Sequence, residues 1–259
     1  MALRRKVSSL LAGGALAAAF VIGGATNVGA ASNGTCAGGT VAPGTYGNLS
    51  IKGFCTIDGG NVNVQQNVQV TSTGLLLAFF SQSTLTVGGN LIVQAGGVLA
   101  LGCDPEENPC FDDPNGTSAH SVSGNLVADH AVLVVVHDSH IGGNVADEGG
   151  GRGLNCDPLF PDGPPAFTDY AANTIGGSAT VTGLRTCWDG FSHNIVSGSV
   201  RLIDNQTLDP DGNLADGNHI AGNFTCLDES PDPHLSDGPV KILNVVGGTV
   251  RGQCVVISA

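Results

Sequence analysis

Apolar and polar residues alternate in short runs along the chain. Val62-Asn63-Val64 and Val68-Gln69-Val70 are two examples. A period of two is typical of β-strands that bury one face, because successive side chains of a strand point in opposite directions. No stretch after residue 30 has the 3.6-residue period of an amphipathic helix. The pattern therefore predicts an all-β protein made of short strands.

A five-residue motif recurs along the same chain. It consists of Ile or Val, a spacer, Gly, then Asn, Ser or Thr, and an apolar residue, which the small Ala179 replaces in one copy. Weaker copies are Gly47-Asn48 and Gly60-Asn61. Such repetition is typical of solenoids, in which each unit packs only on its neighbours. The seven full copies are residues 87–91, 122–126, 141–145, 175–179, 196–200, 220–224 and 246–250.

The order Gly-Asn in this motif separates two possible folds. An antiparallel β-sandwich also has short strands and disulfides, but its hairpins prefer Asn-Gly and it has no reason to repeat Asn and Gly at fixed offsets. The shorter steps between repeat glycines are 19 to 26 residues, which suits one coil. We therefore predict a single-stranded parallel β-helix of about seven coils with projecting loops, over residues 31–259.

The C-terminal copies share a second regularity. An asparagine stands four residues before the repeat glycine, at Asn173, Asn194, Asn218 and Asn244. Asparagine tolerates a left-handed backbone, and its amide can bond to the equivalent residue of the next coil, about 4.8 Å away. We expect these residues to form a structural ladder at one corner of the stack.

Two stretches interrupt the regular spacing. Residues near 102–121 and 148–172 are rich in Gly, Pro and Asp, which are turn and loop residues. We expect both insertions to project from the stack as loops.

The N-terminal 30 residues have the pattern of an export signal. Arg4, Arg5 and Lys6 precede a short apolar run over residues 10–22, and Val28-Gly29-Ala30 offers small residues for cleavage. Residues 1–30 are therefore predicted to be a signal peptide, and the protein to be extracellular, either free or associated with the cell surface. The apolar run is too short for a comfortable membrane span, and no second such stretch follows, so no stable membrane anchor is expected.

The chain is strongly acidic. Its formal net charge is −13, and without residues 1–30 it keeps six basic residues against 22 acidic ones, so the charge becomes −16. An acidic surface repels nucleic acid and anionic lipid, and favours cations or neutral glycans as partners.

All eight cysteines lie after the predicted signal, which favours disulfides in an exported chain. Eight cysteines allow 105 pairings, and no Cys-x-x-Cys spacing suggests zinc. Because each coil of a solenoid touches only its neighbours, we expect pairing in chain order. The expected pairs are Cys36–Cys55, Cys103–Cys110, Cys156–Cys187 and Cys226–Cys254.

Several stretches besides the repeats carry a resemblance to known proteins. They are Thr35-Cys36, residues 41–46, residues 220–226 and Gly252-Gln253-Cys254. With the repeats, they resemble a group of small secreted actinobacterial proteins built from Val-Gly-Gly-Asn repeats. The acidic, proline-rich insertions depart from that group. The resemblance implies a secreted parallel β-helix and supplies no activity.

One acidic stretch suggests a metal site. Asp209, Asp211 and Asp216 surround Gly212, and oxygen ligands on alternate residues around a glycine turn suit calcium. The alternative is an acidic surface turn, because Asp and Gly are ordinary turn residues. No other cofactor is expected.

Histidine and tryptophan provide two further candidates. Asp129-His130 and residues 137–140 bracket an apolar run, and a His/Asp group could bind a transition metal or move protons. His130 and His137 would lie on opposite faces of an unbroken strand, which favours solvated corners instead. Trp188, the only tryptophan, would be a sugar platform if exposed, although we expect it to be buried.

Two classes of function fit these observations. The first is a disulfide-stabilised extracellular protein with a structural, surface or binding role, with glycans or cell-surface components as candidate partners. The second is a carbohydrate-active enzyme, a polysaccharide lyase or hydrolase, on a β-helix scaffold. The sequence offers no catalytic residues, so the first is preferred. Three or more charged side chains converging in a groove would favour the enzyme.

Overall fold

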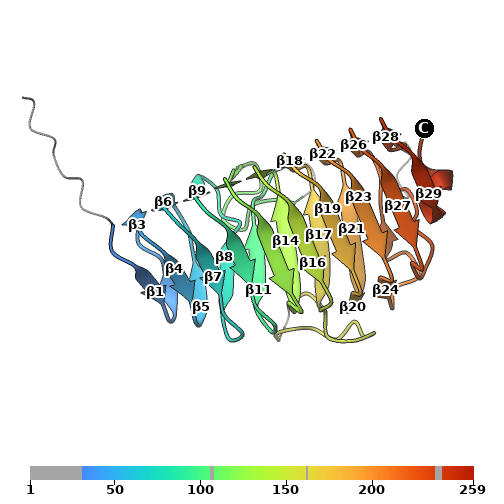
Figure 1. The fold of residues 1–259 in the computed structure, drawn as a ribbon. Helices are drawn as coiled ribbons and strands as arrows, with labels where there is room; N and C mark the ends of the chain where they lie inside the picture. The colour runs from blue at the N-terminus through green and yellow to red at the C-terminus, as the bar shows by residue number, and fades with distance from the viewer. Residues whose placement is uncertain (1–30, 106–107, 162, 237–240) are drawn as a thin grey trace, which may run out of the picture. The chain divides into compact units, whose positions relative to one another are not determined.

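The computed structural model describes residues 31–105, 108–161, 163–236 and 241–259, which form one compact unit. This unit is a parallel β-helix, as the repeats predict (Figure 1). The chain makes three strands per coil, and each joins the sheet of the equivalent strand in the coil before it. The described residues contain no helix whose length and hydropathy would allow it to cross a bilayer.

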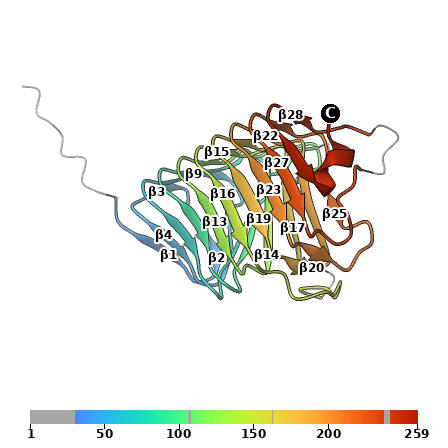
Figure 2. The same cartoon turned by 45° about the vertical axis from the view of Figure 1, so that its right-hand side comes forward.

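Three parallel sheets make up the coils (Figure 2). Sheet A contains β1 (Gly34–Cys36), β4 (Leu49–Ile51), β7 (Val68–Val70), β10 (Leu91–Val93), β13 (Leu126–Asp129), β16 (Val145–Glu148), β19 (Ala179–Thr182), β23 (Val200–Ile203), β27 (Phe224–Leu227) and β29 (Val250–Gly252). Sheet B contains β2 (Gly39–Thr40), β5 (Phe54–Thr56), β8 (Leu75–Ala78), β11 (Val98–Leu101), β14 (Leu133–His137), β17 (Phe167–Ala171), β21 (Trp188–Ser192) and β25 (Asn213–Leu214). Sheet C contains β3 (Gly44–Tyr46), β6 (Gly60–Val64), β9 (Ser83–Val87), β12 (Ser121–Val122), β15 (His140–Ile141), β18 (Thr174–Ile175), β22 (Ile195–Val196), β26 (His219–Ile220) and β28 (Val245–Val246). A small additional pair is formed by β20 (Arg185–Thr186) and β24 (Gln206–Thr207).

The apolar residue that closes each repeat lies inside the stack. Leu91, Leu126 and Val145 are register partners on adjacent strands of sheet A, and each is almost completely buried. The row continues through smaller and larger side chains to Phe224. Alternation with period two thus places one side of every strand in a single core along the axis.

The stack is longer than the repeats suggest. Sheet A has ten strands rather than the seven expected, because β1, β4 and β7 form three further coils without the full motif. Gly60-Asn61 is not a corner: it lies in β6, and the corner of that coil carries Asn67 instead. The second insertion also ends before residue 172, because residues 167–171 form β17.

The corner before sheet A is held by an unbroken ladder of side chains. At each step the backbone N–H of one corner residue donates to the side-chain oxygen of its equivalent in the preceding coil, over 2.8 to 3.1 Å. A glycine precedes most of these ladder residues because the preceding coil lies too close to leave room for a Cβ atom. A Cβ on Gly89 would lie 2.6 Å from the Asn67 Oδ1 and from the carbonyl oxygen of Gln66. The ladder residues are Asn33, Asn48, Asn67, Asn90, Asn125, Asn144, Ser178, Ser199, Asn223 and Thr249.

The corner after sheet B carries the asparagines that the sequence singles out. Asn194 accepts the backbone N–H of Asn173, Asn218 accepts that of Asn194, and Asn244 accepts that of Asn218. Each Nδ2 also donates to a carbonyl oxygen near the end of sheet B in the preceding coil. All four side chains are buried, so these bonds satisfy backbone groups that water cannot reach.

A histidine occupies the same corner in an earlier coil. The Nδ1 atom of His120 accepts the backbone N–H of Leu85 at 2.9 Å, and its Nε2 lies 2.7 Å from the carbonyl oxygen of Ala78. These bonds require the neutral ring with the proton on Nε2. Burial lowers the pKa of His120 to about 4, which keeps the ring neutral.

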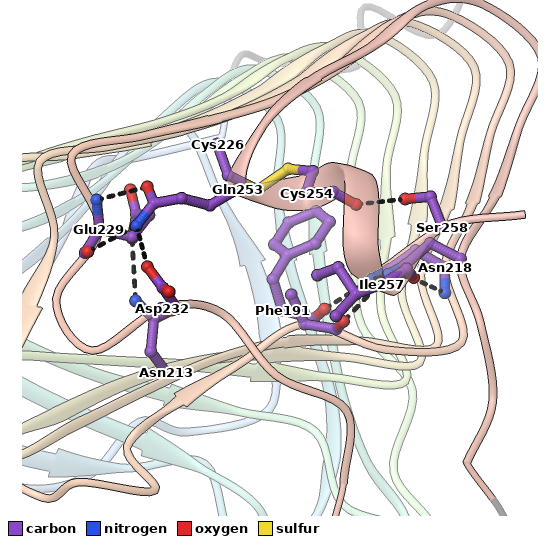
Figure 3. Close-up of a disulfide and its surroundings, with 12 residues drawn as sticks. Phe191, Asn213, Asn218, Cys226, Glu229, Asp232, Gln253, Cys254, Ile257 and Ser258 are labelled. Carbon is purple, nitrogen blue, oxygen red and sulfur yellow. Dashed lines mark hydrogen bonds between the residues drawn. A yellow bond between two sulfur atoms is a disulfide. The ribbon is translucent and has the colours of Figure 1, made fainter.

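The C-terminal end of the stack is closed by the 3₁₀ helix η1 (Gln253–Ile257), shown in Figure 3. Cys254 is joined to Cys226 of β27, and Ile257 is buried in the core. The side chain of Gln253 accepts the backbone N–H of Glu229 and donates to Asp232. The cap therefore covers the last inward-facing side chains and continues the corner bonding.

Four disulfides link the coils and loops in the order that adjacency predicts: Cys36–Cys55, Cys103–Cys110, Cys156–Cys187 and Cys226–Cys254. No described cysteine is free. This set indicates that the protein folds in an oxidising environment.

The ladder predicts a measurable loss of stability. Asn218→Ala should lower the free energy of unfolding by about 1–3 kcal/mol, because it leaves the N–H of Asn194 and the carbonyl of Phe191 buried without their partner. Urea unfolding measures the change, and Asn63→Ala, which removes an exposed asparagine of β6, is the control. Equal stability of the two variants would contradict the ladder.

A second prediction concerns pH. The folded-state pKa of His120 lies below its ordinary value of 6.5, so the unfolded chain takes up the proton first as pH falls. The stability contributed by His120 is complete above pH of about 6.5 and is lost as pH falls toward 4. His120→Asn places a side-chain amide at the corner that does not titrate. Its free energy of unfolding should therefore fall less than that of the wild type as the pH is lowered from 7 to 4. Urea unfolding at several pH values tests this, with the exposed His140→Asn as control. A pH-independent difference would show that the prediction is wrong.

Candidate functional site

The outer face of sheet B changes from apolar to polar along the stack. On β14 the side chains of Leu133, Val135 and His137 point outward, while Val134 and Val136 belong to the interior core. The register places Val135 beside Asp169 of β17, and His137 beside Ala171. The outer face of sheet B thus changes from apolar to acidic side chains between the adjacent strands β14 and β17.

The apolar half of this face forms a second hydrophobic cluster, outside the coils. Leu75, Val98, Ala100, Leu133 and Val135 are buried there, although they point away from the main core. They are covered from two sides. The first loop, of which residues 102–105 and 108–120 are described, follows the end of β11, and the second, of which residues 149–161 and 163–166 are described, precedes β17 (Figure 1). The loops therefore flank opposite ends of the strands.

Between the loops lies an apolar cleft of about 430 Å³. Its walls include five phenylalanines, of which Phe111 is 75% exposed and Phe160 is 46% exposed. The Phe111 ring makes edge contacts with the rings of Phe79 and Phe80. Cys103–Cys110 closes the first loop, and Cys156–Cys187 ties the second to the start of β21. The disulfides thereby restrain both walls.

The polar half contains a pocket of about 290 Å³. His137, Ala171 and Ser192 form one outward row on adjacent strands, and Asp169 and Gly190 form the next. The small Ala171 lines a hollow between the larger groups. The pocket is lined by His137, Asp169, Ala171, Trp188, Ser192, His193, Leu214, Asp216 and Ser236.

Polar atoms in this pocket lack partners. The Nε2 atom of His137 lies 2.7 Å from the Asp169 Oδ2, and both side chains are largely buried. The Asp216 Oδ2 accepts the backbone N–H of Ser236. By contrast, the His137 Nδ1, the Ser192 Oγ and the Asp216 Oδ1 are buried without a hydrogen-bond partner. Buried polar atoms of this kind are rare in folded proteins, and three in one pocket indicate a place for a polar ligand.

Trp188 forms the side of the pocket that faces the cleft. Its ring packs edge-on against Phe167, which lines the cleft, with centroids 5.9 Å apart. Gly190 leaves the room that the ring needs: a Cβ there would lie 2.7 Å from the Trp188 Cη2 and 2.5 Å from the Asp169 Oδ1. The indole is neither fully exposed nor fully buried, so the expectation of a buried Trp188 is only partly met.

Carboxyl groups also lie inside the coils behind the pocket. Burial raises the pKa of Asp147 to about 7, although the Tyr170 hydroxyl donates to its Oδ2. Burial, and then the charges of Glu229, Asp169 and Asp147, raise the pKa of Asp189 well above its usual range. Burial also raises the pKa of Glu229 to about 7. The wall behind the pocket is therefore largely uncharged in mild acid.

The proposed calcium ligands do not come together. Asp209 accepts the backbone N–H of Asp211 in its own turn, and Asp211 is exposed. Asp216, five residues later, faces the pocket on sheet B. Among the described residues, no group of three or more His, Cys, Asp or Glu side chains could hold a metal ion. In this stretch the Asp209 carboxylate bonds to the backbone of its own turn.

The histidine group is also divided by the fold. His130 lies at an exposed corner with a positive φ, paired with Asp129. His140 is exposed on β15, whereas Ser139 belongs to the asparagine corner and donates its N–H to Asn173. Only His137 reaches the pocket, where its partner is Asp169.

The sequence does contain a signal for this pocket. His137, Ala171, Ser192 and Asp216 each stand two residues before a position of the asparagine corner. Aligning the repeats on that corner, rather than on the glycine, would have placed them in one outward row. The insertions hide this row because they make the distances along the chain unequal.

Comparisons of the chain with family models, with curated proteins and with solved structures found no match. The assignment of the site therefore depends on its own geometry.

The packing at Gly190 predicts a spectroscopic change. Gly190→Ala places a methyl group against the indole of Trp188 and the carboxylate of Asp169, so the ring must shift. Because Trp188 is the only tryptophan, its fluorescence should change, and stability should fall by about 1–3 kcal/mol. Ile195→Ala, at an exposed site on β22, is the control and should leave the emission unchanged. An unaltered spectrum of Gly190→Ala would contradict the packing.

Proposed function

We propose that this protein is a secreted binding protein, and that the pocket on sheet B holds a sugar residue of a neutral glycan. The export pattern of residues 1–30 and the four disulfides support secretion. The observation that carries the proposal is the group of three buried polar atoms without partners, at His137, Ser192 and Asp216.

Those groups suit a polyhydroxylated ligand. A carboxylate oxygen accepts hydrogen bonds, a hydroxyl donates and accepts them, and a ring nitrogen does either according to its tautomer. Sugar hydroxyls both donate and accept, so they can pair with all three. Trp188 adds an amphipathic aromatic ring at one side. The excess of 22 acidic over nine basic residues disfavours anionic polymers.

Binding to a panel of neutral oligosaccharides tests this proposal, with calorimetry on each ligand found. Asp216→Asn and Ser192→Ala should each weaken binding by about ten- to a hundredfold, since each removes a hydrogen bond in a buried site. Neither should lower the free energy of unfolding, because each atom removed has no protein partner. Asp211→Asn, on the exposed turn, is the control. Failure of the whole panel, or unchanged affinity of both pocket variants, would refute the proposal.

A specific arrangement favours a second candidate, hydrolysis of a glycan. His137, Asp169, His193 and Asp216 converge in one pocket, and a carboxylate orients the ring of His137 as in acid–base catalysis. Ser192 is no nucleophile for His137: it stands two strands away, about 10 Å, whereas such a pair needs about 3 Å. Release of new reducing ends from a bound glycan would distinguish hydrolysis from binding alone.

A further inference from the structure

The apolar cleft and the polar pocket adjoin each other, because Val135 of the cleft is the register partner of Asp169 of the pocket. Both lie on the outer face of sheet B, and the rings of Phe167 and Trp188 make contact where they meet. The floor of the cleft runs from β5 to β17, five adjacent strands, or about 19 Å at the usual strand spacing. A single ligand that occupies both parts must therefore be polar at one end and apolar along an extended tail.

The lining of the cleft determines the chemistry of the tail. Among the described residues that line it, Asn108 has the only polar side chain, and the other side chains are aromatic or aliphatic. The strands that form its floor already pair their backbone groups with each other. A peptide or a glycan would bury many N–H, C=O or O–H groups there without partners. A hydrocarbon chain has none to satisfy.

The surroundings determine the charge of the head. Phe111 is followed by Asp112 and Asp113 on the same loop, and the pocket contains Asp169 and Asp216. Arg152 lines a neighbouring hollow that shares Val98 and Phe160 with the cleft, but it lines neither the cleft nor the pocket. Carboxylates at both ends of the surface disfavour an anionic head, such as a fatty acid or a phospholipid.

We propose that sheet B binds a neutral glycolipid, with the sugar head in the pocket and the acyl or alkyl tail in the cleft between the loops over residues 102–120 and 149–166. This inference rests on the proposed function, because it places the sugar in the same pocket. It adds the substrate class and gives the two disulfide-restrained loops a role as walls of the tail site.

Alkyl maltosides with chains of eight, ten and twelve carbons, kept below their micelle concentrations, test the inference. The oxidised protein is prepared from a secreting host, and Trp188 fluorescence and calorimetry report binding. Affinity should rise about fourfold for each methylene buried in the cleft. Phe111→Ser and Phe160→Ser should remove most of this dependence on chain length. Both side chains are already substantially exposed, so the fold should tolerate the changes. Leu154→Ser, an exposed residue of the same loop as Phe160 outside the cleft, is the matched control.

The outcomes separate the two proposals. If maltose oligosaccharides and all alkyl maltosides bind equally well, the tail site is refuted and the glycan pocket stands. Loss of chain-length dependence in Leu154→Ser as well would also refute the tail site. Equal binding of laurate or of dodecanol would refute the neutral sugar head. If an extended apolar peptide bound more tightly than the alkyl maltosides, the cleft would be a peptide site and the inference would be overturned. A dimer that Phe111→Ser dissociates would show that a second copy of the chain covers the cleft, which would also overturn it. If no sugar-bearing ligand binds, both proposals fail.

Discussion

Every corner of this solenoid must provide hydrogen bonds for backbone groups that the sheets leave unpaired. Within a sheet, each parallel strand pairs with the coils on either side. At a corner the peptide planes turn, and the N–H groups need acceptors from a side chain of a neighbouring coil. Nine side chains supply that acceptor before sheet A, and a mostly asparagine row supplies it after sheet B. The short polar side chain at a fixed offset is therefore the constraint from which the coil geometry follows.

The corner tolerates other groups if their protonation suits the bonds. His120 fits only as a neutral ring, and its pKa is lowered. At a third corner, Glu229 occupies the position that an asparagine takes elsewhere, and the side-chain amides of Asn205 and Asn213 donate to its carboxyl group. Burial raises the pKa of Glu229 to about 7. The two pKa shifts have opposite effects on how stability depends on pH. Stability from His120 is lost as pH falls below about 6.5, whereas stability from a protonated Glu229 is lost as pH rises through about 7. The two effects therefore oppose each other over nearly the same pH range.

The corners also explain how far the sequence predicts the structure. Gly-Asn and the upstream asparagines predict the parallel β-helix because each coil requires the same bonds, so the chemistry repeats. Two of the first three coils escape detection because Asn33 and Asn67 are preceded by Ser32 and Gln66 rather than by glycine, whereas Gly47-Asn48 marks the coil between them. The pocket could not be predicted from local motifs. Asp169 and Ser192 acquire their neighbours only through the register of three coils, and the insertions change the chain distance between them. Asp209, Asp211 and Asp216 are close in sequence, yet the Asp209 carboxylate bonds to its own turn and Asp216 faces the pocket.

A face built on such a scaffold can recognise a ligand only through side chains. The sheet pairs its own backbone groups along its length, and the corner ladders pair the remainder, so the outer surface of sheet B offers few peptide N–H or C=O groups to a ligand. Specificity must then come from the row positions that point outward, and from loops that insert without disturbing the corners. Those are the two places where this chain departs from its repeat. The small Ala171 lines a hollow between His137, Asp169 and Ser192. The disulfide-restrained loops carry Phe111 and Phe160 over the apolar strands. The regular part of the sequence therefore maintains the stack, and the irregular part has the freedom to acquire a binding function.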